Sequence, residues 1–234
     1  MSRFHFKQFS LAHDRSSMKV GTDGILIGAW AAEDTTPRRV LDIGTGCGII
    51  ALMLAQRFPN AEVVAIERDT RSAQQAQENF AASPWAERIA AVHSTLQDYS
   101  PDGCFDLIVS NPPWFQNSLK PPDAVRASAR HDDWLSTEEL LDRGERLLST
   151  DGRLCCILPI EQEQHVCDVA KARGLFVQRR CRIRPRPEKD PHRAMLAFAT
   201  SESSVKETEL AIEVERHFPT PEYRTLTSEF LLKH

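Results

Sequence analysis

Short apolar runs alternate along the chain, from residue 39 onward, with segments whose apolar residues recur every three or four positions. Five of the short runs have the length of a strand and lie at 39–43, 62–67, 89–92, 105–109 and 153–158. Such alternation is typical of a mostly parallel sheet with helices on both faces. Two later runs, 176–184 and 194–200, are joined by a short proline-rich loop, which favours an antiparallel pair. The pattern therefore predicts an α/β fold with a mostly parallel seven-stranded sheet and a C-terminal antiparallel hairpin.

Capping residues mark two of the expected helices. Ser136 and Glu139 stand three positions apart, as in a capping box, before a run with helical spacing. A helix at 161–173 should end at Gly174, which can adopt the left-handed cap conformation. No internal repeat, low-complexity tract or Gly/Ser-rich linker divides the chain. We therefore expect one core domain, 37–200, with the segments 1–36 and 201–234 packed on it.

The composition is that of a globular protein. Of the 234 residues, 41% are hydrophobic and 26% are charged, a balance that excludes an intrinsically disordered chain. No apolar run approaches the roughly 18 residues that a membrane span needs. Residues 1–10 mix charged and aromatic side chains and lack the apolar stretch of a secretory signal, so we expect a cytoplasmic protein. The six cysteines form no C-x-x-C pair and the histidines show no ligand spacing, so no metal is expected.

The charge is unevenly distributed. The net charge is -4, yet the stretch 171–193 holds nine basic and two acidic residues. A basic stretch on an acidic protein can form a local phosphate-binding face. A solvated surface without a partner is the alternative, and the charge pattern alone does not decide between the two.

A glycine-rich loop joins the apolar run at 39–43 to the helix expected at 49–57. Gly44, Gly46 and Gly48 allow backbone angles that side chains forbid and let the backbone approach a ligand. A dinucleotide loop has the pattern G-x-G-x-x-G, but here Ile49 occupies the position of its third glycine. Asp42, just before the loop, would repel a pyrophosphate and suits a cofactor that carries ammonium and sulfonium charges.

The loop resembles the first motif of the class I S-adenosylmethionine-dependent methyltransferases, which implies their Rossmann-like fold. By this resemblance Glu67, at the end of the second strand, accepts hydrogen bonds from both ribose hydroxyls. Asp98 is a candidate contact of the cofactor adenine amino group. The cofactor-binding residues expected in this part of the chain are Asp42, Gly44, Thr45, Gly46, Cys47, Gly48, Glu67, Arg68 and Asp98.

A second motif, Asn111-Pro112-Pro113-Trp114, follows the fourth strand. It matches the (Asp/Asn/Ser)-Pro-Pro-aromatic motif of methyltransferases that act on a nitrogen conjugated to a π-system. Such a nitrogen is a poor nucleophile, because its lone pair is delocalised, and its hydrogens must be held by acceptors. The Asn111 side-chain oxygen and the Pro112 carbonyl can supply those acceptors. Pro112 and Pro113 stiffen the loop, and Trp114 would stack on the flat substrate.

The segments 4–9 and 18–30 resemble the bacterial tRNA (adenine-N6)-methyltransferase family, which modifies the adenosine beside the anticodon of a valine tRNA. The resemblance extends through 41–48, 110–115 and 220–226, although Trp114 stands where Tyr is commoner in the family. It implies a tRNA partner for an enzyme that we expect to be a monomer. It also implies that the N-terminal segment covers the cofactor's methionine end with Lys19, Gly21, Thr22 and Asp23, and that Asn111 contacts the cofactor. The alternative for 18–30 is an N-terminal helix that merely covers the sheet, and in either case we expect Ile25, Leu26 and Trp30 to cover it.

A tRNA substrate strengthens the interpretation of the basic stretch as a phosphate-binding track, with Arg179, Arg180, Arg182, Arg184 and Arg186 as candidate contacts. The tetrapeptide at 111–114 also occurs in enzymes that methylate guanine N2 of ribosomal RNA or a glutamine of release factors. Release-factor enzymes need a docking domain before the core, for which 36 residues are few. A non-catalytic RNA-binding protein is the alternative from another class, and the intact motif argues against it.

Overall fold

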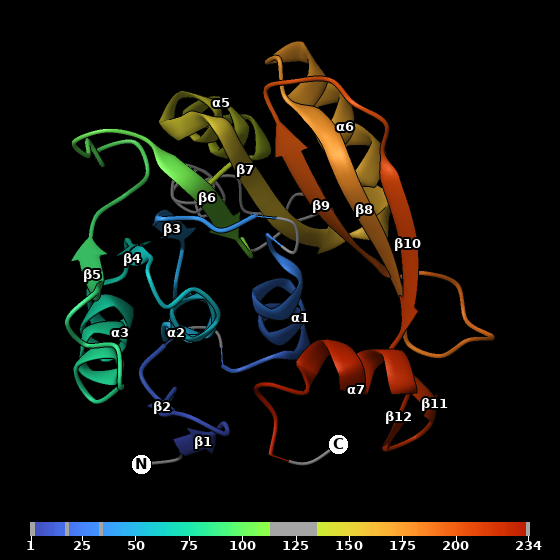
Figure 1. Cartoon of the computed structure of the whole chain (residues 1–234), viewed down its shortest axis with the longest axis horizontal. Coiled ribbons are helices and arrows are strands. Elements are labelled where there is room, and N and C mark those ends of the chain that lie inside the picture. Colours follow the sequence, from blue (N-terminus) through green and yellow to red (C-terminus); the bar gives the residue numbers. More distant parts are fainter. Residues whose placement is uncertain (1–2, 17–18, 33–34, 113–134, 233–234) are drawn as a thin grey trace, which may run out of the picture.

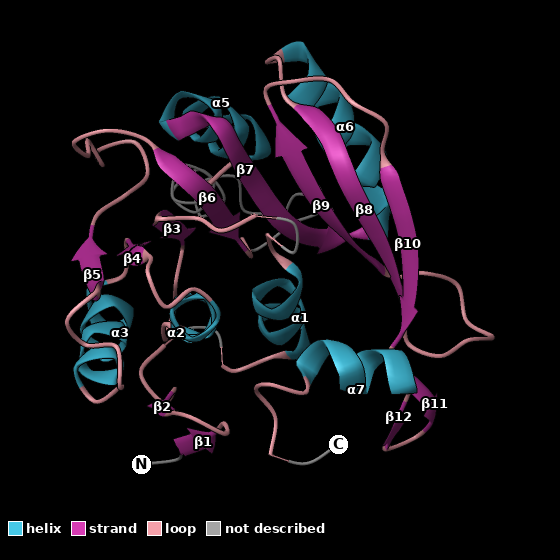
Figure 2. Cartoon of the chain, in the orientation of Figure 1, coloured by secondary structure: helices cyan, strands magenta, loops and turns pink. Residues whose placement is uncertain are grey.

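The computed structural model describes residues 3–16, 19–32, 35–112 and 135–232. At its centre lies a sheet built from β3 (Arg39–Ile43), β4 (Glu62–Glu67), β5 (Ile89–His93), β6 (Phe105–Ser110), β7 (Leu148–Pro159), β8 (Phe176–Arg184), β9 (Arg193–Ala199) and β10 (Lys206–Ala211). These eight strands of the described chain follow the order β10-β8-β9-β7-β6-β3-β4-β5 (Figures 1 and 2). Neighbours pair in parallel, except that β9 is antiparallel to both β7 and β8.

All seven strands expected from the sequence are present, and the hairpin of β8 and β9 is antiparallel as predicted. The predicted count of seven was wrong by one, because β10 from the C-terminal segment pairs in parallel with β8 at the edge of the sheet. Its residues 206–209 are exposed and polar, and only Leu210 is buried. An edge strand whose side chains are exposed to solvent does not need alternating apolar and polar residues, so the hydrophobic pattern of the sequence does not reveal it.

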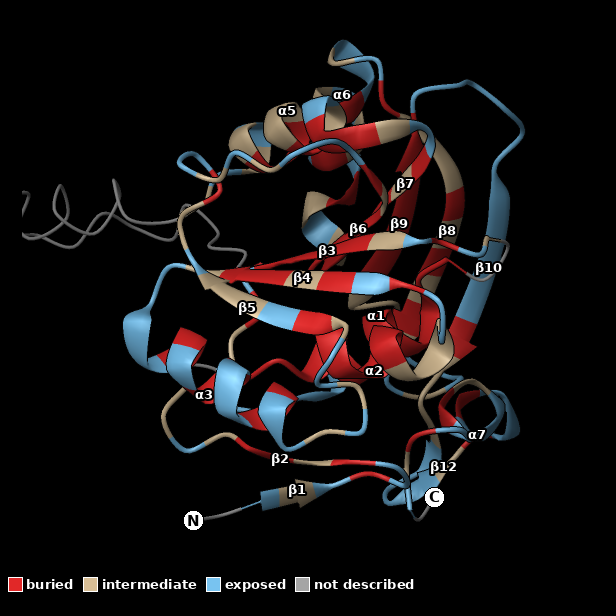
Figure 3. Ribbon diagram, turned by 60° about the vertical axis from the view of Figure 1, so that its left-hand side comes forward, coloured by how far each residue is buried: buried red, intermediate tan, exposed pale blue. Residues whose placement is uncertain are grey.

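Helices cover both faces of the sheet. On one face lie α1 (Thr22–Trp30), α2 (Ile49–Arg57) and α3 (Thr70–Ala81), and on the other lie α5 (Thr137–Leu147) and α6 (Glu163–Ala172). Side chains of a strand point alternately to the two faces, so Val40 belongs to the first core cluster and its neighbour Leu41 to the second. Figure 3 shows the resulting band of buried residues through the centre of the sheet.

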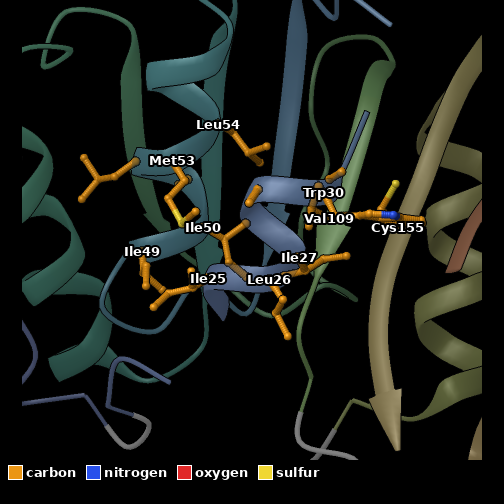
Figure 4. Packing of buried hydrophobic residues seen from close by; sticks show 14 of the residues in the cluster. Ile25, Leu26, Ile27, Trp30, Ile49, Ile50, Met53, Leu54, Val109 and Cys155 are labelled. Carbon is orange, nitrogen blue, oxygen red and sulfur yellow. The ribbon is translucent and has the colours of Figure 1, made fainter. Parts of the chain in front are cut away.

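Helix α1 lies beside α2 on the same face of the sheet and contacts β7 (Figure 1), and it positions one wall of the pocket described below. Ile25, Leu26 and Trp30 are buried among α2 residues and the strand residues Val109 and Cys155 (Figure 4), which confirms that they cover the sheet. A Cβ at Gly28 would lie 2.8 Å from the sulfur of Met53 on α2. The missing side chain therefore allows the two helices to approach closely.

The predicted caps are confirmed. The Ser136 hydroxyl accepts a hydrogen bond from the Glu139 N–H, the Glu139 carboxylate accepts one from the Ser136 N–H, and Gly174 has a φ of 74°. A 3₁₀ turn, Ile160–Gln162, precedes α6. The remaining elements are β1 (Arg3–His5), β2 (Ser10–Ala12), β11 (Glu213–Glu215), β12 (Phe218–Pro219) and α7 (Pro221–Thr227).

The two ends of the chain meet beside α1 and α2. Phe6 forms an isolated antiparallel bridge with Leu231, and Phe6 and Phe230 join the same core cluster as Trp30. Both flanking segments thus pack on the core, while the proposed divisions at residues 36 and 200 stay a prediction. Within the described ranges, no helix is long and apolar enough to cross a bilayer.

Candidate active site

A pocket of about 400 Å³ opens at the edge of the sheet where the parallel strands end. Nine of the residues expected from the sequence line it: Lys19, Gly21, Thr22, Asp23, Gly44, Thr45, Gly46, Cys47 and Asn111. Sequence reasoning missed five further lining residues: Gly24, Ile49, Ile50, His192 and Ile212. Segments from the N-terminus, the glycine loop, the end of β6 and the C-terminal half of the chain therefore meet at one site, as ligand sites of α/β sheets do.

The three glycines of the loop all have left-handed φ angles but serve different purposes. A Cβ at Gly44 would meet nothing within 4 Å, so this part of the loop faces open space in the pocket. A Cβ at Gly48 would clash with the ring of Phe80 on α3. Gly48 does not line the pocket, and its role in the structure is to let α3 pack against the start of α2.

Asp42 lies under the loop rather than in the pocket. One carboxylate oxygen, Oδ2, accepts hydrogen bonds from the Thr45 hydroxyl (2.6 Å) and the Ala51 N–H (3.1 Å). The other oxygen, Oδ1, is buried and has no hydrogen-bond partner among the described residues. Burial raises the pKa of Asp42 to about 7, against the opposing effect of the two hydrogen bonds. Asp42 therefore supports the pocket-lining Thr45 and the first turn of α2.

Glu67 ties β4 to the glycine loop. Its carboxylate accepts hydrogen bonds from the Gly46 N–H and the Asp69 N–H, both at 2.9 Å. Each oxygen has a second lone pair, so the carboxylate can still accept from a ligand's hydroxyl groups. The Asp98 carboxylate accepts a hydrogen bond from the Thr95 hydroxyl within a local turn. Glu67, Arg68 and Asp98 are not among the residues that line the pocket, so their cofactor contacts stay predictions.

The N-terminal segment is held over the loop by α3. The buried Asn79 amide accepts a hydrogen bond from the Ala12 N–H and donates to the carbonyls of Ala12 and Cys47, each at 2.8 Å. The Gln75 side-chain oxygen accepts from the N–H groups of residues 15 and 16. Asn79 thus joins the glycine loop to the chain that leads to Lys19.

The start of α1 faces the pocket. Its N-cap, Gly21, makes no side-chain hydrogen bond to the helix, so the first N–H groups of α1 are open to an anionic ligand. The Asp23 carboxylate accepts a hydrogen bond from Arg193 Nε at 3.0 Å, and this ion pair joins α1 to β9. Asp23 therefore lines the pocket and also fixes the position of α1 through this ion pair.

The motif that begins at Asn111 starts where β6 ends. The buried Ser110 hydroxyl donates a hydrogen bond to the Ile43 carbonyl at 2.9 Å, which holds the end of β6 beside the glycine loop. Asn111 is partly exposed and lines the pocket, and Pro112 is buried. The predicted Pro113 and Trp114 lie outside the described residues. Within the ranges that the structure does describe, no group of His, Cys, Asp and Glu could hold a metal ion.

Comparisons with known proteins agree with this geometry. The family model for the methyltransferase small domain matches residues 18–169. A protein of Bacteroides fragilis (strain YCH46) named tRNA1(Val) (adenine(37)-N6)-methyltransferase is 45% identical over 98% of both chains. A protein of the same name from Trichodesmium erythraeum is 42% identical and covers 100% of this chain and 99% of its own. The chain belongs to this methyltransferase family.

The fold of this methyltransferase also matches solved structures. A predicted O-methyltransferase from Agrobacterium tumefaciens superposes with a TM-score of 0.67 at 22% identity and covers 89% of this chain and 96% of its own. At that identity the likeness concerns the fold, which is the Rossmann-like fold of class I methyltransferases. The cofactor of a methyltransferase with this fold is S-adenosylmethionine. The open space at Gly44 and the uncapped start of α1 fit such a ligand.

The basic stretch of this methyltransferase differs from the expectation. Arg180 pairs with Glu163 (3.0 Å) and Glu207 (2.8 Å), Arg182 pairs with Glu163 (2.8 Å), and Arg184 pairs with Glu209 (3.0 Å). Arg179 is buried, with its guanidinium 4.2 Å from the centre of the Trp30 ring. Carboxylates of α6 and β10 therefore offset much of the charge on β8. A phosphate-binding track through these arginines receives no support from the structure.

Proposed function

We propose that this enzyme transfers a methyl group from S-adenosylmethionine to N6 of an adenosine in a tRNA anticodon loop, namely adenosine 37 of a valine tRNA. The observation that carries the proposal is the identity of 42–45% over nearly the full length with relatives of that name. The lining of the pocket supports it, because the glycine loop and Asn111 face one cavity.

The start of α1, the glycine loop and the end of β4 would together hold the cofactor. Lys19, Thr22 and the open N–H groups of α1 suit its carboxylate, and the backbone from Gly44 to Gly46 gives it room to lie against the loop. Glu67, already fixed by two N–H groups, would accept from the ribose hydroxyls. When bound, S-adenosylmethionine supplies an electrophilic methyl group on a sulfonium sulfur.

The target amine would be held at the end of β6. Asn111 Oδ1 and the Pro112 carbonyl are the proposed acceptors for its two hydrogens, which would turn its lone pair toward the methyl group. The end of β6 is fixed through Ser110, so Asn111 is carried by a rigid strand rather than by a free loop. Stacking of the adenine on Trp114 stays a prediction.

An anticodon loop suits this pocket because its bases are already unstacked, so little energy is needed to turn one out of the loop. We place the reaction in the cytoplasm, where tRNA is modified in bacteria, and we propose that a monomer performs it.

The test is nucleoside mass spectrometry on tRNA taken from a strain without the gene and incubated with the protein and S-adenosylmethionine. We expect N6-methyladenosine to appear, and to disappear again with the Asn111→Ala variant. Ribosomal RNA from the same strain is incubated in parallel. If the tRNA stayed unchanged while this ribosomal RNA gained N2-methylguanosine, the enzyme would belong with the guanine methyltransferases instead.

A further inference from the structure

His192 is a polar residue of the pocket to which the proposed function assigns no role. It stands at the end of the loop that joins β8 to β9, directly before the first residue of β9. It lines the same pocket as Asn111 and is partly buried. Its main-chain carbonyl accepts hydrogen bonds from the Ile160 N–H (3.2 Å) and from Arg193 Nη1 (3.0 Å).

The surroundings of the ring select one tautomer. Nδ1 lies 3.1 Å from the Ile183 carbonyl oxygen, which can only accept a hydrogen bond, so Nδ1 must carry the hydrogen. In the neutral ring Nε2 then has a free lone pair. If Nε2 gains a proton, the hydrogen bond from Nδ1–H to the Ile183 carbonyl can be kept.

Methylation of an amine releases a proton that some group must take. When the amine nitrogen has gained a methyl group it has four bonds and a positive charge. One N–H bond must then break, with its electron pair left on nitrogen. The proton becomes acidic while the new N–C bond forms, so a weak base such as imidazole can accept it during the methyl transfer, and loss of that base then slows the transfer itself.

Few of the other described groups that line the pocket can accept this proton. The Asn111 amide oxygen is not basic, and the Thr45 hydroxyl, also a very weak base, already donates its hydrogen bond to Asp42. A lysine ammonium, as at Lys19, has no lone pair, and the Asp23 carboxylate is engaged by Arg193. Nε2 of His192 carries the one imidazole lone pair among these lining residues.

We propose that His192 is the proton acceptor of the methyl-transfer reaction. The proton passes from the methylated amine to Nε2, directly or through one water, and the lone pair of Nε2 forms the new N–H bond. The ring is partly exposed, so the imidazolium can return the proton to solvent. The Asp23–Arg193 ion pair, next to His192 in the chain, positions this wall of the pocket. This inference rests on the proposed function.

The decisive variants are His192→Asn and His192→Ala, assayed on an unmodified anticodon stem–loop RNA. Asn can keep an N–H donor near the Ile183 carbonyl but has no basic nitrogen, so we expect kcat to fall about 100-fold, as for loss of a general base. Cofactor affinity measured by calorimetry should stay near that of the wild type. In His192→Ala, added imidazole should restore part of the lost rate. His165→Asn, a histidine on α6 that does not line the pocket, is the matched control and should keep wild-type kcat.

A readout independent of turnover is nitrogen NMR of the histidine rings in the cofactor-free protein, where His192 should carry its hydrogen on Nδ1. An active wild type with an equally active His192→Asn variant would overturn the inference. A His192→Ala variant whose rate added imidazole cannot restore would also overturn it, because the ring would then only fill space in the pocket lining. A wild type that leaves the RNA unmethylated would instead refute the proposed function, and this inference with it.

Discussion

The buried carboxylate of Asp42 should make this protein lose stability as the pH rises. Its pKa is about 7 in the folded protein against 3.8 for the ordinary aspartate, because burial disfavours the charged form. A folded-state pKa above the unfolded one means that the stabilisation is complete below pH 3.8 and is lost as the pH rises through 7. Over the whole range the loss amounts to about 4 kcal/mol, at about 1.4 kcal/mol for each pKa unit.

The part of this loss that is accessible to experiment lies between about pH 5.5 and about pH 8, where linkage gives about 2 kcal/mol. Other groups titrate in the same range, so the measurement must compare two proteins. The side-chain amide of an Asp42→Asn variant cannot ionise, and its oxygen can still accept from Thr45 and Ala51. The difference in unfolding free energy between the variant and the wild type should therefore grow in favour of the variant by about 2 kcal/mol from the lower to the higher pH.

The assay is urea unfolding of the cofactor-free proteins, followed by tryptophan fluorescence at both pH values, with the m-value checked for constancy. A difference that is the same at both pH values would refute the reasoning, since it would mean that Asp42 ionises equally in the folded and unfolded states. A change in the opposite direction would show that a nearby positive charge outweighs the cost of burial.

Three further outcomes follow from the site. Glu67→Ala should weaken S-adenosylmethionine binding by about 1.5–3 kcal/mol in calorimetry, the scale of charged hydrogen bonds, and unchanged affinity in a folded variant would exclude the ribose contact. Asn111→Ala should abolish turnover and leave cofactor affinity near wild type, whereas a wild-type kcat would make the motif structural. Arg182→Ala should lower the unfolding free energy by about 1 kcal/mol, because the ion pair with Glu163 is lost. The salt dependence of tRNA binding should stay unchanged in this variant, and a shallower salt dependence would indicate that Arg182 contacts a phosphate of the tRNA.

Much of the fold and nine of the fourteen residues that line the pocket could be predicted from the sequence, because the signals are local. Gly44 and Gly46 require backbone angles that nearby residues alone specify, and strand length and helical spacing are set by neighbours in the chain. The capping box at Ser136 and the hairpin of β8 and β9 depend on a few adjacent residues in the same way. Asn111 could be placed at the site because it directly follows a strand, and parallel strands end at one edge.

Tertiary structure decided the properties that depend on partners distant in the chain. Arg180, Arg182 and Arg184 of β8, which suggested a phosphate surface, meet glutamates of α6 and β10, and no spacing rule relates these segments. Asp42 was expected to face a cationic cofactor, but the folding of the loop over it buries its carboxylate and raises its pKa. His192 reaches the pocket because the loop before β9 returns to the edge where β3 and β6 end. Local backbone preferences thus determine the elements, whereas burial and charge pairing arise only when those elements pack together.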